Sequence, residues 1–197
     1  MKSFLPLGFE DLITEDGILQ YFENYSNESI DNVLMNLVWR QDPITMFGKT
    51  YPQPRMTSWH GEKGITYSYS GIKMVAQEWT PTLLKLKKQL EDDLHTKFNS
   101  VLVNYYRDGN DHMSYHADDE KELGVNPVIA SLSFGETRSF QLKHRFDSAK
   151  KPISIPVNNG SLIVMKGELQ HFWIHKIAKT KKTIGPRVNL TFRYVYS

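Results

Sequence analysis

The sequence predicts a mainly β fold of the α+β class, in which helices and hairpins precede a jelly-roll core. After residue 100, short runs rich in Val, Ile, Phe and Tyr alternate with turn residues, as antiparallel strands do. Before residue 100, two segments carry apolar residues at helical spacing, and Gly and Pro interrupt residues 43–64 between them. Many short strands after a partly helical third favour two packed sheets with helices on one side.

Two helices are expected in the first half of the chain. The first follows Asn27 or Ser29, either of which could cap it, and its apolar positions are Ile30, Val33, Leu34, Leu37 and Val38. The second is the clearer one, because Thr80 can cap it and Pro81 suits its first turn. Its apolar stripe consists of Leu83, Leu86, Leu90 and Leu94.

Seven strands are expected in the second half of the chain. They span residues 101–106, 128–134, 139–143, 153–157, 161–165, 172–177 and 188–195. The number of strands by itself does not separate a jelly roll from other folds with two sheets.

Composition narrows the class of protein. The 197 residues are 40% hydrophobic and 23% charged, as in ordinary globular proteins, and the net charge of +2 allows a nucleic-acid partner without requiring one. The absence of cysteine excludes disulfides, thiolate zinc sites and cysteine nucleophiles. The N-terminus does not resemble a secretory signal, and no stretch approaches the about 20 apolar residues of a membrane span. We therefore expect no membrane partner and an intracellular location, cytoplasmic in a bacterium and compatible with the nucleus in a eukaryote.

A candidate metal site begins with His116 and Asp118, which lie two residues apart. On an extended segment both side chains leave on the same side and can reach one ion. Two histidines and one carboxylate on one face of a metal are the ligands of non-haem iron(II) oxygenases. The second histidine could be His171 or His175, and spacing does not choose between them. The other histidines are expected to face solvent or to be structural: His60, His95, His112 and His144.

The last predicted strand has two chemically different faces. One face is apolar, and the other carries Arg187, Asn189, Thr191 and Arg193. A solvated polar face is the usual meaning of such alternation, but two arginines around an amide and a hydroxyl also suit a dicarboxylate, since the Arg fork matches a carboxylate. On another alternating strand, Asn104 and Tyr106 share a face. Together the two strands could hold both ends of a small diacid.

In this order, these features resemble the AlkB family of Fe(II)- and 2-oxoglutarate-dependent dioxygenases, particularly its animal homologues that act on nucleic acid. The similarity runs from about Phe47 to Tyr196 and is densest in residues 101–120, 127–138 and 186–193. The resemblance implies a double-stranded β-helix with an N-terminal nucleotide-recognition lid. Within one compact domain, residues 1–99 would form the helices and the lid, and residues 100–197 the catalytic core.

The resemblance also implies roles for individual residues. The family's last metal ligand lies in a Trp-x-His context, which matches His175 rather than His171. Fe(II) would therefore be held by His116, Asp118 and His175, and O2 would be the co-reactant. The implied 2-oxoglutarate contacts are Asn104, Tyr106, Arg187, Asn189, Thr191 and Arg193. Among them, Arg187 would pair with the distal carboxylate, and Arg193 would act at the carboxylate near the metal.

The implied lid residues come from two segments. Phe47, Gly48 and Lys49 resemble a hairpin that duplex-binding members push into the base stack. Tyr67 and Tyr69 resemble the aromatics that cover the flipped base, although core packing is an equal alternative for Tyr67. Asp119 and Glu120 match acidic residues that face the substrate, and a carboxylate there could meet a cationic alkylated base.

The expected activity is oxidative dealkylation of nucleobases of the 1-methyladenine and 3-methylcytosine type in DNA or RNA. It would release succinate, CO2 and formaldehyde. A dioxygenase acting on protein or a small molecule is the alternative among enzymes, and a non-catalytic nucleic-acid-binding module is the alternative outside them. We expect the protein to act as a monomer.

Overall fold

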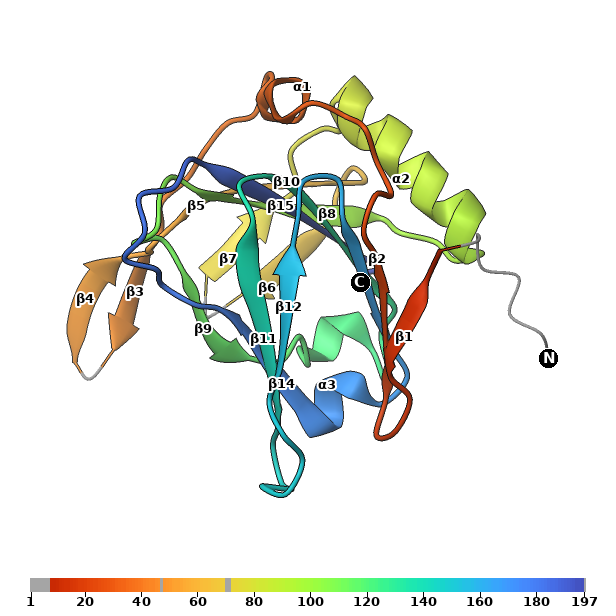
Figure 1. Cartoon of the computed structure of the whole chain (residues 1–197). Helices are drawn as coiled ribbons and strands as arrows, with labels where there is room; N and C mark the ends of the chain where they lie inside the picture. The colour runs from red at the N-terminus through yellow and green to blue at the C-terminus, as the bar shows by residue number, and fades with distance from the viewer. Residues whose placement is uncertain (1–7, 47, 70–71, 197) are drawn as a thin grey trace.

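Two antiparallel sheets face one another in the computed structural model, which describes residues 8–46, 48–69 and 72–196 (Figure 1). The seven-stranded sheet has the order β1 (Glu10–Ile13), β2 (Ile18–Phe22), β13 (Leu162–Lys166), β10 (Ile129–Gly135), β15 (Arg187–Arg193), β8 (Ser100–Tyr106) and β5 (Met56–Gly61). The four-stranded sheet has the order β12 (Ile153–Val157), β11 (Arg138–His144), β14 (Trp173–Ile177) and β9 (Met113–His116). This arrangement confirms the predicted jelly-roll core.

Two separate hairpins accompany the sheets. One joins β3 (Pro43–Met46) to β4 (Lys49–Pro52), and the other joins β6 (Thr66–Tyr69) to β7 (Ile72–Val75). The β3–β4 hairpin projects from the side of the molecule (Figure 1).

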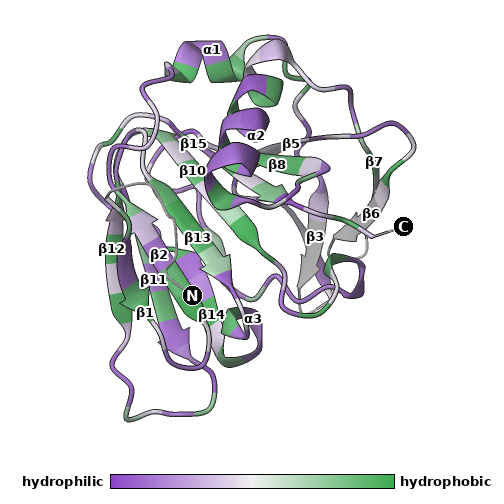
Figure 2. Cartoon of the chain, turned by 90° about the vertical axis from the view of Figure 1, so that its right-hand side faces the viewer, coloured by the Kyte–Doolittle hydropathy of each residue, from purple (hydrophilic) through white to green (hydrophobic). Residues whose placement is uncertain are grey.

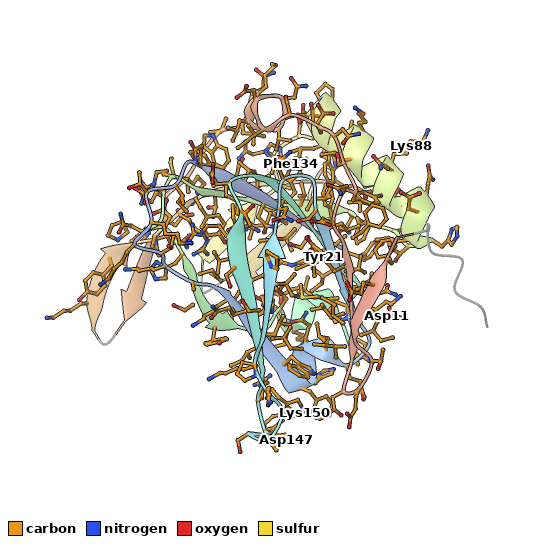
Figure 3. All side chains as sticks on the ribbon, viewed as in Figure 1. Asp11, Tyr21, Lys88, Phe134, Asp147 and Lys150 are labelled. Carbon is orange, nitrogen blue, oxygen red and sulfur yellow. The ribbon has the colours of Figure 1, made fainter. Side chains whose placement is uncertain are left out.

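The outer face of the large sheet is covered by α2 (Pro81–Leu94), as the leucine stripe predicts. Thr80 caps this helix by accepting a hydrogen bond from the amide of Leu83. Leu83, Leu86 and Leu90 are fully buried against the apolar sides of β8, β10 and β15, and Phe134 lies in the same cluster. The opposite side of α2 carries polar residues (Figure 2), and Lys88 points outward from it (Figure 3).

The alternation along β15 and β8 sorts side chains between two compartments. Val188, Leu190 and Phe192 pack under α2, whereas the intervening residues of β15 point into the space between the sheets. A second apolar cluster fills the rest of that space with residues such as Leu142, Ile163 and Trp173. One face of the large sheet therefore stabilises the fold, and part of the other is left for a polar site.

The N-terminal third differs from the prediction. The helix capped by Ser29 exists as α1 (Ile30–Leu34), but it does not reach Leu37, because the backbone is already extended at Met35 (φ −63°, ψ 130°) and Asn36 follows with a left-handed φ of 63°. The preceding residues form β1 and β2, and β2 pairs with β13. Two further short helices, η1 (Lys121–Leu123) and α3 (Leu169–Phe172), complete the elements of the described residues.

Strands from both sides of residue 100 share the large sheet, since β1, β2 and β5 precede it. The first 99 residues thus supply part of the sheet framework as well as both hairpins. Their role in nucleotide recognition stays a prediction. Within the described residues, none of the helices has the length and apolarity needed to span a membrane.

Candidate metal and cosubstrate site

His116 and His175 face one another across two neighbouring strands. The antiparallel register of β9 and β14 places them directly opposite, and their ring centroids are 4.3 Å apart. The Phe140 ring packs against His175 at 5.1 Å. Strand pairing therefore brings together two histidines that are far apart in the sequence.

Asp118 completes the cluster from the loop that follows β9. Its Oδ1 lies 3.7 Å from Nε2 of His116, and one ligand atom from each of the three residues lies within 4.8 Å of the others. Arg193 donates to Oδ2 at 2.8 Å, whereas Oδ1 is buried without a hydrogen-bond partner among the described residues. An unpaired oxygen facing two imidazoles fits a metal ligand better than a purely structural ion pair.

The hydrogen bonds of His116 select its ligand nitrogen. Its Nδ1 lies 2.9 Å from the carbonyl oxygen of Ser114, so Nδ1 carries the proton and donates it. Nε2 is then the unprotonated nitrogen that faces the cluster. A backbone acceptor of this kind is the usual partner behind a metal-ligating histidine.

Charge and burial keep all three groups in the forms that bind a cation. Burial lowers the pKa of His175 to about 3, and burial also lowers the pKa of His116. Burial alone would raise the pKa of Asp118, but Arg193 and the two histidines hold it well below its ordinary value. Two neutral imidazoles beside a carboxylate can ligate a metal without first losing protons.

His171 lies outside this cluster. It is exposed, and its Nε2 is 2.8 Å from the side-chain oxygen of Asn126. The structure thus supports His175 as the third member. Elsewhere, His60 is buried between Ser58 and the carbonyl oxygen of Glu78, as expected of a structural histidine.

A polar wall faces the metal cluster from the large sheet. The register of β15 and β8 pairs Arg187 with Tyr106 and Asn189 with Asn104, so the residues predicted on two strands form one surface. The cavity between the sheets is lined by this wall, the cluster and their neighbours: Asn104, Tyr106, Met113, His116, Asp118, Ser131, Phe140, Met165, His175, Lys176, Ile177, Arg187, Asn189, Thr191 and Arg193.

Arg187 is the most unusual member of the wall. It is only 2% exposed, and it donates from Nη2 to Ser133 Oγ at 2.9 Å. Its Nε and Nη1 are buried and have no hydrogen-bond partner among the described residues. Its guanidinium carbon lies 5.1 Å from the ring centroid of Tyr106, and burial lowers the Arg187 pKa to about 10. A buried cation with two donors that lack partners fits a ligand carboxylate. The carboxylate would accept from both donors and would balance the charge of the guanidinium.

Known proteins match most of this chain. The 2OG-Fe(II) oxygenase superfamily matches residues 17–193. The mouse protein named alpha-ketoglutarate-dependent dioxygenase alkB homolog 3 is 39% identical over 96% of this chain. Its human counterpart is 37% identical over 98% of the chain, which spans 69% of that protein. The chain belongs to the AlkB family.

Other AlkB relatives extend the comparison. Human DNA oxidative demethylase ALKBH2 is 37% identical over 77% of this chain. The solved structure of OsALKBH1 has the same fold, with a TM-score of 0.69 at 14% identity over 94% of this chain and 99% of that one. The chain spans 64% of the length of the mouse homolog 3 and 62% of the rat one.

Two residues behind the AlkB site were missed by sequence reasoning. Arg55 is buried and donates to the side-chain oxygen of Asn104 at 2.8 Å, which orients one amide of the wall. Gln170 is buried and accepts a hydrogen bond at 2.9 Å from the backbone amide of Asp118. Neither lies in a local pattern that signals its role, because its partner is distant in the sequence.

Among the predicted substrate contacts, the described ones are absent from the cavity lining: Gly48, Lys49, Asp119 and Glu120. Gly48 and Lys49 are exposed at the turn of the β3–β4 hairpin, and Gly48 has a φ of 73°. Phe47 lies outside the described residues. Tyr67 and Tyr69 belong to β6, whose pairing with β7 is described but whose side chains at these positions are not.

The two acidic residues after Asp118 do not line the cavity in this structure. Asp119 is paired with Arg145 at 3.3 Å, and both side chains are partly exposed. Glu120 is half-buried and immediately precedes η1. Because the exposed pair with Arg145 is weak, Asp119 keeps the freedom to interact with a ligand.

Proposed function

We propose that this protein is an Fe(II)- and 2-oxoglutarate-dependent dioxygenase that removes alkyl groups from nucleobases in nucleic acid. The observation that carries the proposal is one cavity with a His–Asp–His cluster on one sheet and an under-satisfied buried arginine on the other. The His–Asp–His cluster suits a metal ion that keeps open coordination positions, and the arginine suits one carboxylate of a diacid.

The residues have separate tasks in this reaction. His116, Asp118 and His175 would hold Fe(II), which supplies the oxidation of the N-alkyl carbon together with O2 and 2-oxoglutarate. Arg187 would bind and orient the distal carboxylate of 2-oxoglutarate. Arg193 holds Asp118 in place by its 2.8 Å contact and would also interact with the carboxylate near the metal. The apolar cluster beside the cavity excludes water from the reaction.

Nucleic acid is supported as the substrate by the relatives and by local charge. Human ALKBH2 is named a DNA oxidative demethylase. Lys176 lines the cavity, and its Nζ and that of Lys143 lie 4.4 and 4.6 Å from the ring centroid of Tyr115. Within the described part of the chain, no ion pair involves either lysine. Two unneutralised cations near the site suit a phosphate backbone.

Selectivity for alkylated bases would come from charge. Methylation at N1 of adenine or N3 of cytosine makes the base cationic. Asp119 and Glu120 directly follow the metal ligand Asp118, where such a base would enter. A carboxylate there would favour the cation over the neutral normal base.

The deciding experiment supplies Fe(II) and 2-oxoglutarate with oligonucleotides carrying 1-methyladenine or 3-methylcytosine, in single and double strands. Formaldehyde and succinate should appear in equal amounts, and His175→Ala should yield neither. Succinate without formaldehyde on every oligonucleotide would support the dioxygenase but reject the nucleobase substrate, which is the outcome expected for an enzyme acting on protein or a small molecule. No 2-oxoglutarate turnover under any condition would reject both.

We further propose that the enzyme acts as a monomer inside the cell. The cluster residues and the polar wall of this chain lie around one cavity. Light scattering after gel filtration tests the monomer, and microscopy of the tagged protein tests the location.

A further inference from the structure

We propose that Gln170 is a positioning residue of the metal centre, whose side chain sets the place of the ligand Asp118. This inference rests on the proposed function only for the identity of the metal. It starts from the fact that Asp118 does not belong to a strand: β9 ends at His116, and the register of the sheet ends with it. Something other than strand pairing must therefore hold the third ligand.

Two hydrogen bonds hold Asp118, one at its side chain and one at its backbone. Arg193 donates to its carboxylate, and Gln170 accepts from its backbone amide at 2.9 Å. Asp118 is 1% exposed and Gln170 is 2% exposed, so water does not replace either partner. A buried amide that loses its acceptor keeps the full desolvation cost, and the chain then moves to find another partner.

Gln170 is itself held in one orientation. Its Nε2 donates to Sδ of Met165 at 3.5 Å, which leaves Oε1 to accept from Asp118. Met165 also lines the cavity. The side-chain amide thus lies between the loop that carries Asp118 and β13. Its oxygen accepts from the first and its nitrogen donates to the second.

The location of Gln170 links the positions of two metal ligands, Asp118 and His175. It lies in α3, which leads directly into β14, where His175 follows five residues later. Outside the cavity, Arg145 reaches the same two segments, since its Nη1 lies 3.3 Å from both Asp119 Oδ2 and the carbonyl oxygen of Gln170. The loop that carries Asp118 is therefore fastened to the segment that carries His175 by a buried contact and an exposed one.

The test compares Gln170→Met, which keeps the length of the side chain but removes the acceptor, with Gln170→Glu, which keeps it. Binding of Mn(II) alone is measured by calorimetry. Gln170→Met should bind Mn(II) about 10- to 100-fold more weakly, the usual effect of losing a partner behind a metal ligand. Gln170→Glu should stay near the wild-type affinity. Gln20→Met is the matched control, because Gln20 is also buried but lies in β2, and it should leave Mn(II) binding unchanged.

A second measurement does not depend on the metal, and its first part uses the wild type alone. In the metal-free wild type, the Asp118 amide should exchange its hydrogen as slowly as the paired amides of β14, and in Gln170→Met it should exchange quickly. Unchanged Mn(II) affinity in folded Gln170→Met would overturn the proposal, as would rapid exchange of the Asp118 amide in the wild type. Neither readout involves nucleic acid, so failure of the demethylase proposal would leave this test intact.

Discussion

At the scale of single residues, the site depends on charges placed where water cannot reach them. Asp118 has an arginine partner and two neutral imidazoles, whereas Arg187 has a hydroxyl, an aromatic ring and two idle donors. The two charged groups therefore respond differently to substitution. Removing a ligand of the cluster takes away metal binding, while removing Arg187 takes away a cation that is costly to bury in the absence of its ligand.

Substitution of His175 and of His171 distinguishes a metal ligand from a nearby histidine that does not bind the metal. His175→Ala should abolish Fe(II)-dependent turnover and reduce metal binding sharply, because one of three protein ligands is lost. His171→Ala should retain most of both, since His171 is exposed and bonded to Asn126. Calorimetry and formaldehyde release measure the two properties. An inactive His171→Ala enzyme alongside an active His175→Ala enzyme would contradict the assignment.

Arg187→Met should have opposite effects on the free and the liganded protein. Without ligand, its melting temperature should equal or exceed that of the wild type, because a buried cation with unused donors is removed. With 2-oxoglutarate, the wild type should be stabilised and the variant should not, while both bind metal. Loss of one partner of a buried charged pair costs about 3–5 kcal/mol, which predicts that the cosubstrate affinity falls by roughly a hundredfold to several thousandfold. Equal stabilisation of the two proteins by 2-oxoglutarate would place the diacid elsewhere.

At the scale of elements, the two faces of β15 have different roles, one in stability and one in chemistry. The apolar side of β15 packs under α2, and its polar side forms the cavity wall. A change on one side should affect folding and a change on the other should affect binding, because the side chains point to different compartments.

The α2 interface offers a matched pair of leucines. Leu86 is 1% exposed and Leu84 is 47% exposed on the same helix. Leu86→Ala should lower the free energy of unfolding by about 2–5 kcal/mol through lost burial and the cavity left behind. Leu84→Ala should change it by no more than about 0.5 kcal/mol. Urea unfolding of both variants measures the difference, and similar losses would mean that α2 is not fastened by its leucine stripe.

The lysines over Tyr115 lie on the small sheet, and their effect should be electrostatic. Lys143→Ala should weaken binding of an unmodified single-stranded oligonucleotide and lower the salt slope by about 0.7 for one lost phosphate contact. Lys88→Ala is the control, because Lys88 is an exposed lysine on the outward side of α2. Binding curves at several salt concentrations test this. Identical slopes for the two variants would remove the Tyr115 lysines from the binding surface.

At the scale of the whole molecule, the sheets form a framework from which the β3–β4 hairpin projects (Figure 1). A projecting hairpin can meet a duplex without disturbing the core. This arrangement separates access to the base, which the hairpin would control, from chemistry on the base, which belongs to the cavity.

Phe47→Ala should therefore slow repair of a lesion in duplex DNA much more than in a single strand. Only the duplex requires a few kcal/mol for unstacking and unpairing, which an inserted apolar side chain would offset. Lys49→Ala should instead weaken binding of both substrates, as expected for a phosphate contact. Rates on both substrates and the melting temperature are measured for each variant. Equal losses for Phe47→Ala on both substrates, with a lower melting temperature, would indicate packing rather than insertion.

The sequence by itself determined those features that depend on near neighbours. The leucine stripe of α2 and the alternation of β15 are patterns that recur every two to four residues, and the Thr80 cap acts on an amide three residues away. Each of the three is present as predicted. The same short range explains the error near the N-terminus. Leu37 and Val38 continue the helical spacing, but the backbone is extended at Met35 and left-handed at Asn36, so neither residue joins α1.

The family resemblance had implied which distant residues share the site, but only the tertiary structure showed how they meet. It placed His175 opposite His116, attached Asp118 to Gln170, and left Arg187 buried with two free donors. These arrangements follow from sheet register and from the exclusion of water by the packed sheets. Both are properties of the whole chain, and neither leaves a periodic trace around the residues concerned.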